Sequence, residues 1–442
     1  MRENHFALPR HEGLGVVAKK EEYFSGVLRK AAGACSERAA PLDSEVVTPQ
    51  LKSLALAPLA LLAGCRHSDF PDYAAGYREF AYVANNAGNT VSVLDLVYLR
   101  PDRTLQVGDA PVAEAVNPKR DEVYVVNSQP GRGEGSVSVI DTQKNAVVAT
   151  IAVHRNPSFI SVDATGHLAY VSNTGSNNIS VLDLDSRRQI TTVRAPDKPA
   201  EAVVSPDGRA LVVTSRVNGT VTVYAADPLG TLNLRGTFKG CPGATGAVIL
   251  PDSSKVFVAC SAGRQVMVVS LAAPPDSSAA RQGQSVEADE VVAMLDVGRN
   301  PANLTLKPDG GELFVSNQGS DSVSEVATQT NDVGSTYPIG NRPAHGVVSA
   351  DNAALWISNS GADSLSLYSI EDGRLLSSIH TGDAPDALAF SDDEHLLLAA
   401  DSKSGDVAVI RTASRLGPAL FTMLPVGGSP VAIVVKAMQP KA

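Results

Sequence analysis

Short stretches of alternating apolar and polar residues recur along most of this chain. Residues 90–94 (TVSVL), 136–140 (SVSVI) and 178–182 (NISVL) are typical, and turn sequences such as 205–208 (SPDG) lie between such stretches. A two-residue period is that of a β-strand with one buried face. Proline fixes φ and glycine accepts a positive φ, as tight turns require. The pattern predicts an all-β protein built from short strands.

One strand type repeats along the chain as aromatic, aliphatic, any residue, asparagine. Clear copies start at Tyr82 (YVAN), Tyr124 (YVVN), Tyr170 (YVSN), Phe314 (FVSN) and Trp356 (WISN). Weaker copies start at Val212, Phe257 and Leu398, which makes eight in all. Successive copies are 42 to 46 residues apart, except for 57 residues between Phe257 and Phe314. This is the length of a four-stranded propeller blade.

A second element, of the form VGxxP, precedes each copy except the first. In six units its proline lies 13 residues before the aromatic position, at Pro111, Pro157, Pro199, Pro301, Pro343 and Pro385. A degenerate form ending in Pro242 precedes Phe257, and VGGSP from Val426 is left over at the end. The first YVxN strand lacks a VGxxP strand, so the two ends of the chain complement each other. We expect them to build one split blade, which closes the ring and removes exposed sheet edges. The repeat count predicts eight blades, with seven as the alternative.

These paired motifs resemble those of the YVTN-repeat, or YncE-like, β-propeller family over about residues 80–436. The resemblance implies a WD40-like ring of four-stranded blades in an exported or surface protein. It implies little about function, since the matching residues are mostly scaffold. A related propeller family contains lactonases that act on a sugar-phosphate lactone.

The N-terminal region has the features of an export signal. Residues 54–63 (LALAPLALLA) form an apolar run too short to cross a bilayer but suited to a signal peptide. Residues 62–65 (LAGC) resemble a bacterial lipobox, which implies cleavage before Cys65 and lipid attachment to its sulfur. The alternative is a buried strand or helix turn that happens to precede a cysteine. About fifty residues precede the apolar run, so we expect translation to start later, at Val47 or Leu51.

The predicted organisation is therefore a leader (1–64), a lipidated tether (65–78), a propeller (79–436) and a C-terminal tail (437–442). We expect a periplasmic or cell-surface lipoprotein of the cell envelope. Arg66 follows Cys65 where an aspartate commonly marks retention in the inner membrane, so the outer membrane is expected in a Gram-negative cell.

Charge and motifs exclude several function classes. The formal net charge is −10, and no lysine- or arginine-rich run could follow a phosphate backbone, so nucleic acid is not an expected partner. The membrane is expected to be contacted only through the lipid. The chain has no CxxCH haem motif, no GxSxG and no P-loop, and its eight histidines form no HxH or HxxxH pair. No cofactor is predicted, and a monomer is expected.

Candidate site residues are those that break the repeat near the start of the inner strands. Two residues after the proline stand Glu201, Asn303 and His345, and Asp386 lies one residue after its proline. We expect all four side chains to face the mouth of a central channel and to bind a small polar or charged ligand. The alternative is that they are solvated channel-lining groups without a ligand. Under a hydrolase hypothesis the same residues would hold a divalent metal, although no catalytic residue is assigned.

Two further expectations concern the face of the ring on which both motifs are expected to lie. The asparagines at Asn85, Asn127, Asn173, Asn317 and Asn359 are expected to cap the following turn through the backbone, with ligand contact as the alternative. Cys241 and Cys260 belong to one blade, and a disulfide between them is predicted, with two buried thiols as the alternative. The insertion at residues 272–290 is expected to be a loop on the opposite face.

The leading function hypothesis is a scaffold at the cell envelope that binds a protein, a glycan or a small polar ligand. The rival hypothesis is a lactonase or other metal-assisted hydrolase, so enzymatic activity is left open with a scaffold favoured.

Overall fold

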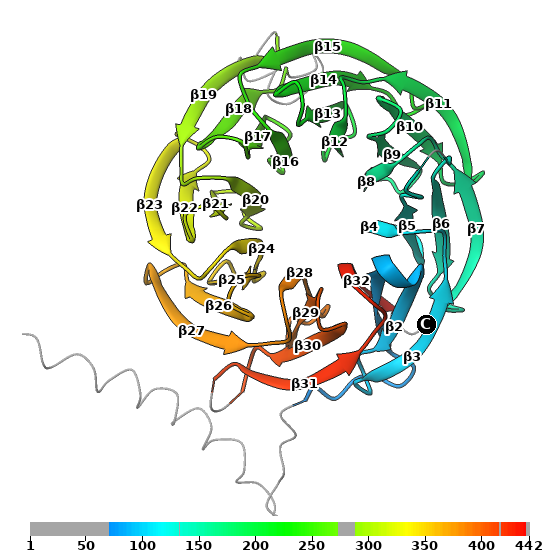
Figure 1. Cartoon of the computed structure of the whole chain (residues 1–442), viewed down its shortest axis with the longest axis vertical. Coiled ribbons are helices and arrows are strands. Elements are labelled where there is room, and N and C mark those ends of the chain that lie inside the picture. The colour runs from blue at the N-terminus through cyan, green and yellow to red at the C-terminus, as the bar shows by residue number, and fades with distance from the viewer. Residues whose placement is uncertain (1–69, 132, 273–287, 415–416, 439–442) are drawn as a thin grey trace, which may run out of the picture. The chain divides into compact units, whose positions relative to one another are not determined.

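The computed structural model describes residues 70–131, 133–272, 288–414 and 417–438. These residues form eight four-stranded antiparallel sheets that stand around one axis as the blades of a β-propeller (Figure 1). The predicted leader, Cys65 and nearly all of the 272–290 insertion lie outside the described residues.

The strands of each blade follow one another from the axis of the ring outward. Blade 1 consists of β32 (Pro430–Met438), β1 (Arg78–Asn85), β2 (Thr90–Asp95) and β3 (Arg100–Gln106), with the 3-10 turn η1 (Asn86–Gly88) between β1 and β2. Blades 2 to 4 are β4 (Pro111–Val116), β5 (Glu122–Asn127), β6 (Ser136–Asp141), β7 (Ala146–Ala152); β8 (Pro157–Val162), β9 (Leu168–Asn173), β10 (Asn178–Asp183), β11 (Arg188–Arg194); and β12 (Pro199–Val204), β13 (Ala210–Ser215), β14 (Thr220–Ala226), β15 (Leu232–Lys239). Blades 5 and 6 are β16 (Ala244–Ile249), β17 (Lys255–Cys260), β18 (Gln265–Ser270), β19 (Glu290–Asp296); and β20 (Pro301–Leu306), β21 (Glu312–Asn317), β22 (Ser322–Ala327), β23 (Asp332–Pro338). Blades 7 and 8 are β24 (Pro343–Val348), β25 (Ala354–Asn359), β26 (Ser364–Ser369), β27 (Arg374–His380); and β28 (Pro385–Phe390), β29 (Leu396–Asp401), β30 (Asp406–Arg411), β31 (Ala419–Pro425).

The ring closes through a split blade, as the partial repeats at the two ends of the chain predict. β32 pairs with β1 along its whole length, from Arg78 opposite Met438 to Asn85 opposite Pro430. In Figure 1 this brings the red C-terminal strand beside the blue N-terminal strands. The all-β fold and the count of eight blades are confirmed, and the alternative of seven is wrong.

In the VGxxP element, the residue before the proline has a left-handed backbone conformation and leads into the inner strand. The residue before the proline has positive φ in seven blades, at Ala110, Asn156, Lys198, Asn300, Arg342, Ala384 and Ser429. Blade 5 differs, because there Gly243 has the positive φ. The next residue, Ala244, pairs with Cys260 in the same way that Pro199 of blade 4 pairs with Ser215. The assignment of Pro242 to the proline position is therefore wrong by two residues.

In five blades the glycine of the first motif packs against the side chain that ends the second motif, as Gly108 does against Asn127. A Cβ added to Gly108 would lie 2.7 Å from Cβ and 2.9 Å from Nδ2 of Asn127, so only glycine fits above the asparagine. Asn127 itself is buried and donates from Nδ2 to Ser136 (3.1 Å) and Ser138 (3.0 Å) on the next strand. Both motifs therefore lie on one face of the ring, which we call the upper face. The asparagines are structural, as expected, but Nδ2 of each donates to a serine hydroxyl of the third strand and not to the turn backbone. Asn173 also donates to the side chain of Asn178.

Hydrophobic side chains pack between neighbouring blades and not around a single centre. One core cluster joins Tyr124 and Val139 of blade 2 to Ile160 and Val171 of blade 3. Within the described residues a corresponding cluster lies at each of the eight blade boundaries. Every blade therefore depends on both neighbours for its burial.

The segment before the first strand packs against blade 8 at the lower face, on the turn between β28 and β29. Phe70 makes edge-on ring contacts with His395 (5.2 Å) and Phe421 (5.0 Å). Tyr73 donates from its hydroxyl to Asp393 (3.2 Å). The described part of the predicted tether is thus attached to the propeller. No helix in the parts of the chain that the structure describes could span a lipid bilayer.

Candidate functional site

Each inner strand has one corresponding position near its upper end, two residues after the proline position. In blade order these residues are Ala432, Ala113, Phe159, Glu201, Gly246, Asn303, His345 and Ala387. We call them the axial positions, and the inner strands that carry them surround the axis in Figure 1. At the axial positions themselves, polar side chains occur in blades 4, 6 and 7, while blades 8, 1, 2 and 3 carry alanine or phenylalanine. Blade 8 adds Asp386, one residue before its axial alanine.

His345 and Asp386 meet across a blade boundary. The imidazole Nδ1 of His345, on β24, lies 2.7 Å from Oδ1 of Asp386, on β28. Both side chains are accessible, with 46% and 36% of their surface exposed. Burial acts to lower the pKa of His345, but the hydrogen bond and charge of Asp386 and the charge of Glu201 outweigh it and raise the pKa.

Glu201 lies on β12, and its carboxylate reaches toward blade 5. Its Oε2 accepts a hydrogen bond from the backbone amide of Ala247 (3.0 Å). Burial raises the pKa of Glu201 to about 7, although the Ala247 amide and the charges of His345 and Arg216 act in the opposite direction. A carboxyl group with this pKa exchanges its proton near neutral pH, as general acids and bases require.

Gly246 leaves space beside this carboxylate. A Cβ at Gly246 would meet Oε1 of Glu201 at 3.9 Å and the carbonyl oxygen of Ala302 at 3.6 Å. Glycine, which has no side chain, thus occupies the axial position between Glu201 of blade 4 and Asn303 of blade 6. The sequence pattern did not reveal Gly246, because the displaced Pro242 hid the axial position of blade 5.

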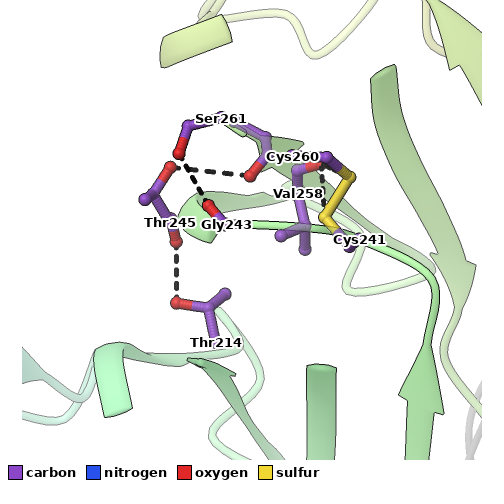
Figure 2. Close-up of a disulfide and its surroundings, with 8 residues drawn as sticks. Thr214, Cys241, Gly243, Thr245, Val258, Cys260 and Ser261 are labelled. Carbon is purple, nitrogen blue, oxygen red and sulfur yellow. Dashed lines mark hydrogen bonds between the residues drawn. A yellow bond between two sulfur atoms is a disulfide. The ribbon is translucent and has the colours of Figure 1, made fainter. Parts of the chain in front are cut away.

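The disulfide of blade 5 fixes the strand that receives Glu201. Cys241 and Cys260 are bonded, and their Cα atoms are 4.7 Å apart (Figure 2). Ser261 donates to the carbonyl of Gly243 (2.8 Å), and Thr214 of blade 4 donates to the carbonyl of Thr245 (2.7 Å). These contacts hold the start of β16, whose Ala247 amide binds Glu201.

The structure brings three of the four predicted residues into one electrostatic group. His345 and Asp386 touch, and Glu201 is near enough to shift the pKa of His345. Asn303 lies at its axial position, but its side chain bonds Thr305 of the same strand (3.2 Å). Among the residues that the structure describes, no three His, Cys, Asp or Glu side chains are arranged to hold a metal ion. Arg216, on the turn after β13, adds a positive charge that the sequence pattern did not indicate.

Comparison with known proteins places the fold in a family. A family described as "Lactonase, 7-bladed beta-propeller" matches residues 98–332 and 326–434, about three quarters of the chain. A curated relative, Antigen Lp49 of Leptospira interrogans, is 27% identical over 143 residues, which is 31% of each protein. The chain thus spans about a third of the length of that relative.

Solved structures show the same fold at low identity. A dihydro-heme d1 dehydrogenase, NirN, superimposes with a TM-score of 0.64 at 14% identity, covering 80% of this chain and 74% of that one. A putative 6-phosphogluconolactonase from Bacteroides uniformis gives 0.53 at 18% identity, covering 72% of this chain and 100% of that one. At these identities the likeness concerns the fold alone. The family match over most of the repeats is the stronger finding, and on that basis this chain belongs to the lactonase family of seven-bladed β-propellers, with eight blades in place of seven.

Proposed function

We propose that this protein is an exported propeller, tethered to a membrane by a lipid on Cys65, that binds a small polar ligand at the upper end of its ring axis. The observation that carries the proposal is the contact between His345 and Asp386 across a blade boundary, together with the charge of Glu201, which acts on His345 from blade 4. The remaining blades carry uncharged residues at the axial positions, so the repeated scaffold alone does not account for these charged groups.

The chemistry of the site suits a hydroxylated ligand such as a sugar or a sugar lactone. Asp386 accepts hydrogen bonds, His345 donates and accepts them, and Glu201 does both because its pKa is about 7. Phe159 and the alanines of blades 1 and 2 occupy the axial positions that precede blade 4 and would supply an apolar wall. Such a combination of a few polar groups with an apolar wall is usual in small-molecule sites.

Binding can be tested by calorimetry on the purified chain with neutral sugars, sugar acids and sugar lactones. A ligand that bonds His345 should bind about tenfold more weakly to His345→Ala, because a hydrogen bond to a charged group is lost. His380→Ala is the matched control, since His380 lies on the outermost strand of the same blade and is exposed. If no compound in the panel binds, or if both variants bind equally, the axial surface is not the site.

A second candidate function, lactone hydrolysis, is favoured by the His345–Asp386 pair and by the family. In this reaction the imidazole takes a proton from water, the water oxygen attacks the lactone carbonyl, and the ring oxygen leaves with a proton from Glu201. Asp386 accepts from Nδ1 of His345 and so leaves Nε2 to act as the base. The product is the open hydroxy acid.

Hydrolysis should then depend on pH in a bell-shaped manner. His345 must be neutral, which requires a pH above its raised pKa, and Glu201 must be protonated, which requires a pH below about 7. Lactone opening followed by pH-stat, with spontaneous hydrolysis subtracted, distinguishes the two functions. Loss of the catalysed rate in Glu201→Gln supports hydrolysis, whereas ligand binding with only the background rate leaves a binding protein.

The anchor can be tested separately. Cys65→Ser should move the protein from the detergent-extracted membrane fraction to the soluble fraction of the cell envelope, because the thioether-linked lipid can no longer form. Cys35→Ser is the control and should leave fractionation unchanged. Membrane association that persists in Cys65→Ser contradicts the proposed anchor.

A further inference from the structure

A cavity lies at the lower face between blades 3 and 4. Its volume is about 1180 Å³. Residues at the lower ends of the strands line it, among them Asp163 and His167 from the β8–β9 turn, Asp183 at the end of β10 and Asp227 from the β14–β15 turn. We call it the lower pocket. It shares no residue with the axial positions, so an inference drawn from it does not rest on the proposed function.

The hydroxyl of Tyr170 lies in the wall of the lower pocket without a hydrogen-bond partner among the described residues. Tyr170 on β9 is only 1% exposed, lines the pocket and makes no hydrogen bond in this part of the chain. Burial, followed by the charges of Asp163 and Asp227, raises its pKa to about 12, so the hydroxyl keeps its proton. With no partner in this part of the chain, the hydroxyl can donate and accept a hydrogen bond to a ligand in the pocket.

The hydroxyl groups of the equivalent tyrosines in the two preceding blades have hydrogen-bond partners. Tyr82 donates to Asn145 of the next blade (2.5 Å). Tyr124 donates to Glu122 (2.6 Å), which also accepts from Arg187 of the next blade (2.7 Å). Asn145 and Arg187 each end the turn between the third and fourth strands. Blade 4 has the longer turn 227–231 (DPLGT) there, and none of its residues bonds Tyr170.

The charge around this hydroxyl is predominantly negative. The lower pocket is lined by five aspartates, Asp163, Asp183, Asp185, Asp207 and Asp227, against Arg209 and Arg235. Arg235 is paired with the buried Asp289, and Asp185 is paired with Arg120 and contacts His167, so the other four aspartates of the pocket wall have no basic partner among the described residues. Hydrogen bonds from Thr231 and its neighbours hold the pKa of Asp227 below its usual value. Burial acts to raise the pKa of Asp183, but hydrogen bonds from Ser186 and Asp185 lower it overall. Both carboxylates are therefore ionised at neutral pH.

The rest of the lining is apolar and open to solvent at its edge. Leu168 and Ile190 belong to blade 3, and Leu229, which is 82% exposed, stands at the blade 4 side. No three carboxylates in the described residues converge tightly enough for a metal ion. Spread around a large cavity, they fit an extended cation with an alkyl chain better than a point charge.

We propose that the lower pocket binds an aliphatic amine carrying two or more ammonium groups. One ammonium group donates a hydrogen bond to the hydroxyl oxygen of Tyr170, and the aspartates of the turns balance the positive charge. The alkyl chain covers Leu168, Ile190 and Leu229. Because the attraction is partly between exposed charges, added salt weakens it.

The test is calorimetric titration of the purified full chain with 1,4-diaminobutane, and with 1,4-butanediol as an uncharged probe of the same length. We expect the diamine to bind and the diol not to bind. Tyr170→Phe should weaken diamine binding about five- to tenfold, the effect of one hydrogen bond. It should leave the melting temperature unchanged or slightly raised, since the hydroxyl has no partner to lose.

Tyr82→Phe provides the matched control, because its hydroxyl is bonded to Asn145 and lies away from the lower pocket. This variant should melt at a lower temperature and bind the diamine as the unmodified chain does. The proposal is overturned if the diamine does not bind, if the diol binds equally well, or if Tyr170→Phe and Tyr82→Phe have the same affinity.

Discussion

Glu114 is a charged residue type at an inner-strand position where apolar side chains usually pack between neighbouring blades. Three residues after the proline, most inner strands place an apolar side chain against the preceding blade, as with Ile160, Leu304 and Ile433. On β4 this position is Glu114, and both carboxylate oxygens are buried without a hydrogen-bond partner among the described residues. Burial raises the pKa of Glu114 well above its usual value. The folded protein therefore holds this side chain as a neutral acid.

Replacing Glu114 should stabilise the protein, and more so at higher pH. A carboxyl group whose pKa is raised by folding binds a proton in the folded state that the unfolded chain has released above its ordinary pKa, 4.5. Stability of the unmodified protein is thus lost as pH rises from about 4.5 toward the folded pKa. We expect Glu114→Leu to raise the free energy of unfolding by about 2 kcal/mol at pH 8 and by less at pH 5.

Urea denaturation at both pH values measures this difference. Glu114→Gln is the control, because it keeps the buried polar group but removes the proton-dependent part. A gain that is equal at pH 5 and pH 8 would show that Glu114 does not titrate in this range.

Gly108 tests the packing that links the two sequence motifs. A Cβ at this position would overlap the side chain of Asn127, which is itself held by two serines. We expect Gly108→Ala to lower the free energy of unfolding by about 1–3 kcal/mol through overpacking. Gly334→Ala is the control, since its nearest heavy atom would be 3.8 Å away, and thermal melting of the two variants should differ clearly. Equal melting temperatures would mean that the backbone at the strand ends shifts enough to accommodate the extra methyl group.

At the level of the element, blade 5 shows where sequence patterns predict the structure and where they do not. The sequence spacing between Phe257 and the preceding copy of the repeat places β17 correctly, because strand length and blade length are local properties. The start of β16 is misplaced because the pattern relied on Pro242. The physical requirement at that point is a left-handed residue before the strand, and Gly243 meets it without a proline.

The site was predictable only in part for a related reason. Sequence differences within the repeat identify Glu201, His345 and Asp386, since a scaffold position is expected to stay the same in every blade. They do not give the His345–Asp386 contact, because that depends on side-chain reach across a blade boundary. The lower pocket was not predictable, since it arises from a longer turn in one blade beside a tyrosine in another.

The disulfide is expected to stabilise blade 5 and to keep β16 in register. A bond between residues 19 apart in sequence contributes about 3 kcal/mol by the loop-entropy model. Cys241→Ser with Cys260→Ser should therefore melt at a lower temperature, and should bind any axial ligand more weakly because the Ala247 amide is less well placed for Glu201. The unmodified chain in reductant should behave like the double variant. Alkylation detected by mass spectrometry only after reduction confirms the bond, and unchanged mass would contradict it.

For the whole molecule, ring closure depends on a strand that is synthesised last. Each blade buries its apolar side chains against both neighbours, and blade 1 obtains its innermost strand from residues 430–438. β32 contributes Ile433 to the cluster shared with blade 8 and Met438 to the cluster shared with blade 2. Its loss would expose the edge of β1 and open two interblade cores at once.

A chain that ends at Pro425 should therefore fail to form a stable monomer. The exposed edge of β1 offers unpaired backbone groups for pairing between molecules, so we expect aggregation and a broad, low-temperature melt. A chain that lacks only residues 439–442 is the control and should behave as the full protein does. A synthetic peptide of residues 428–438 should restore the monomer when added to the truncated chain, because it can pair with β1 as an added strand. Light scattering after size-exclusion chromatography measures each outcome. A truncated chain that stays monomeric and melts like the control would mean that seven blades close without the split blade.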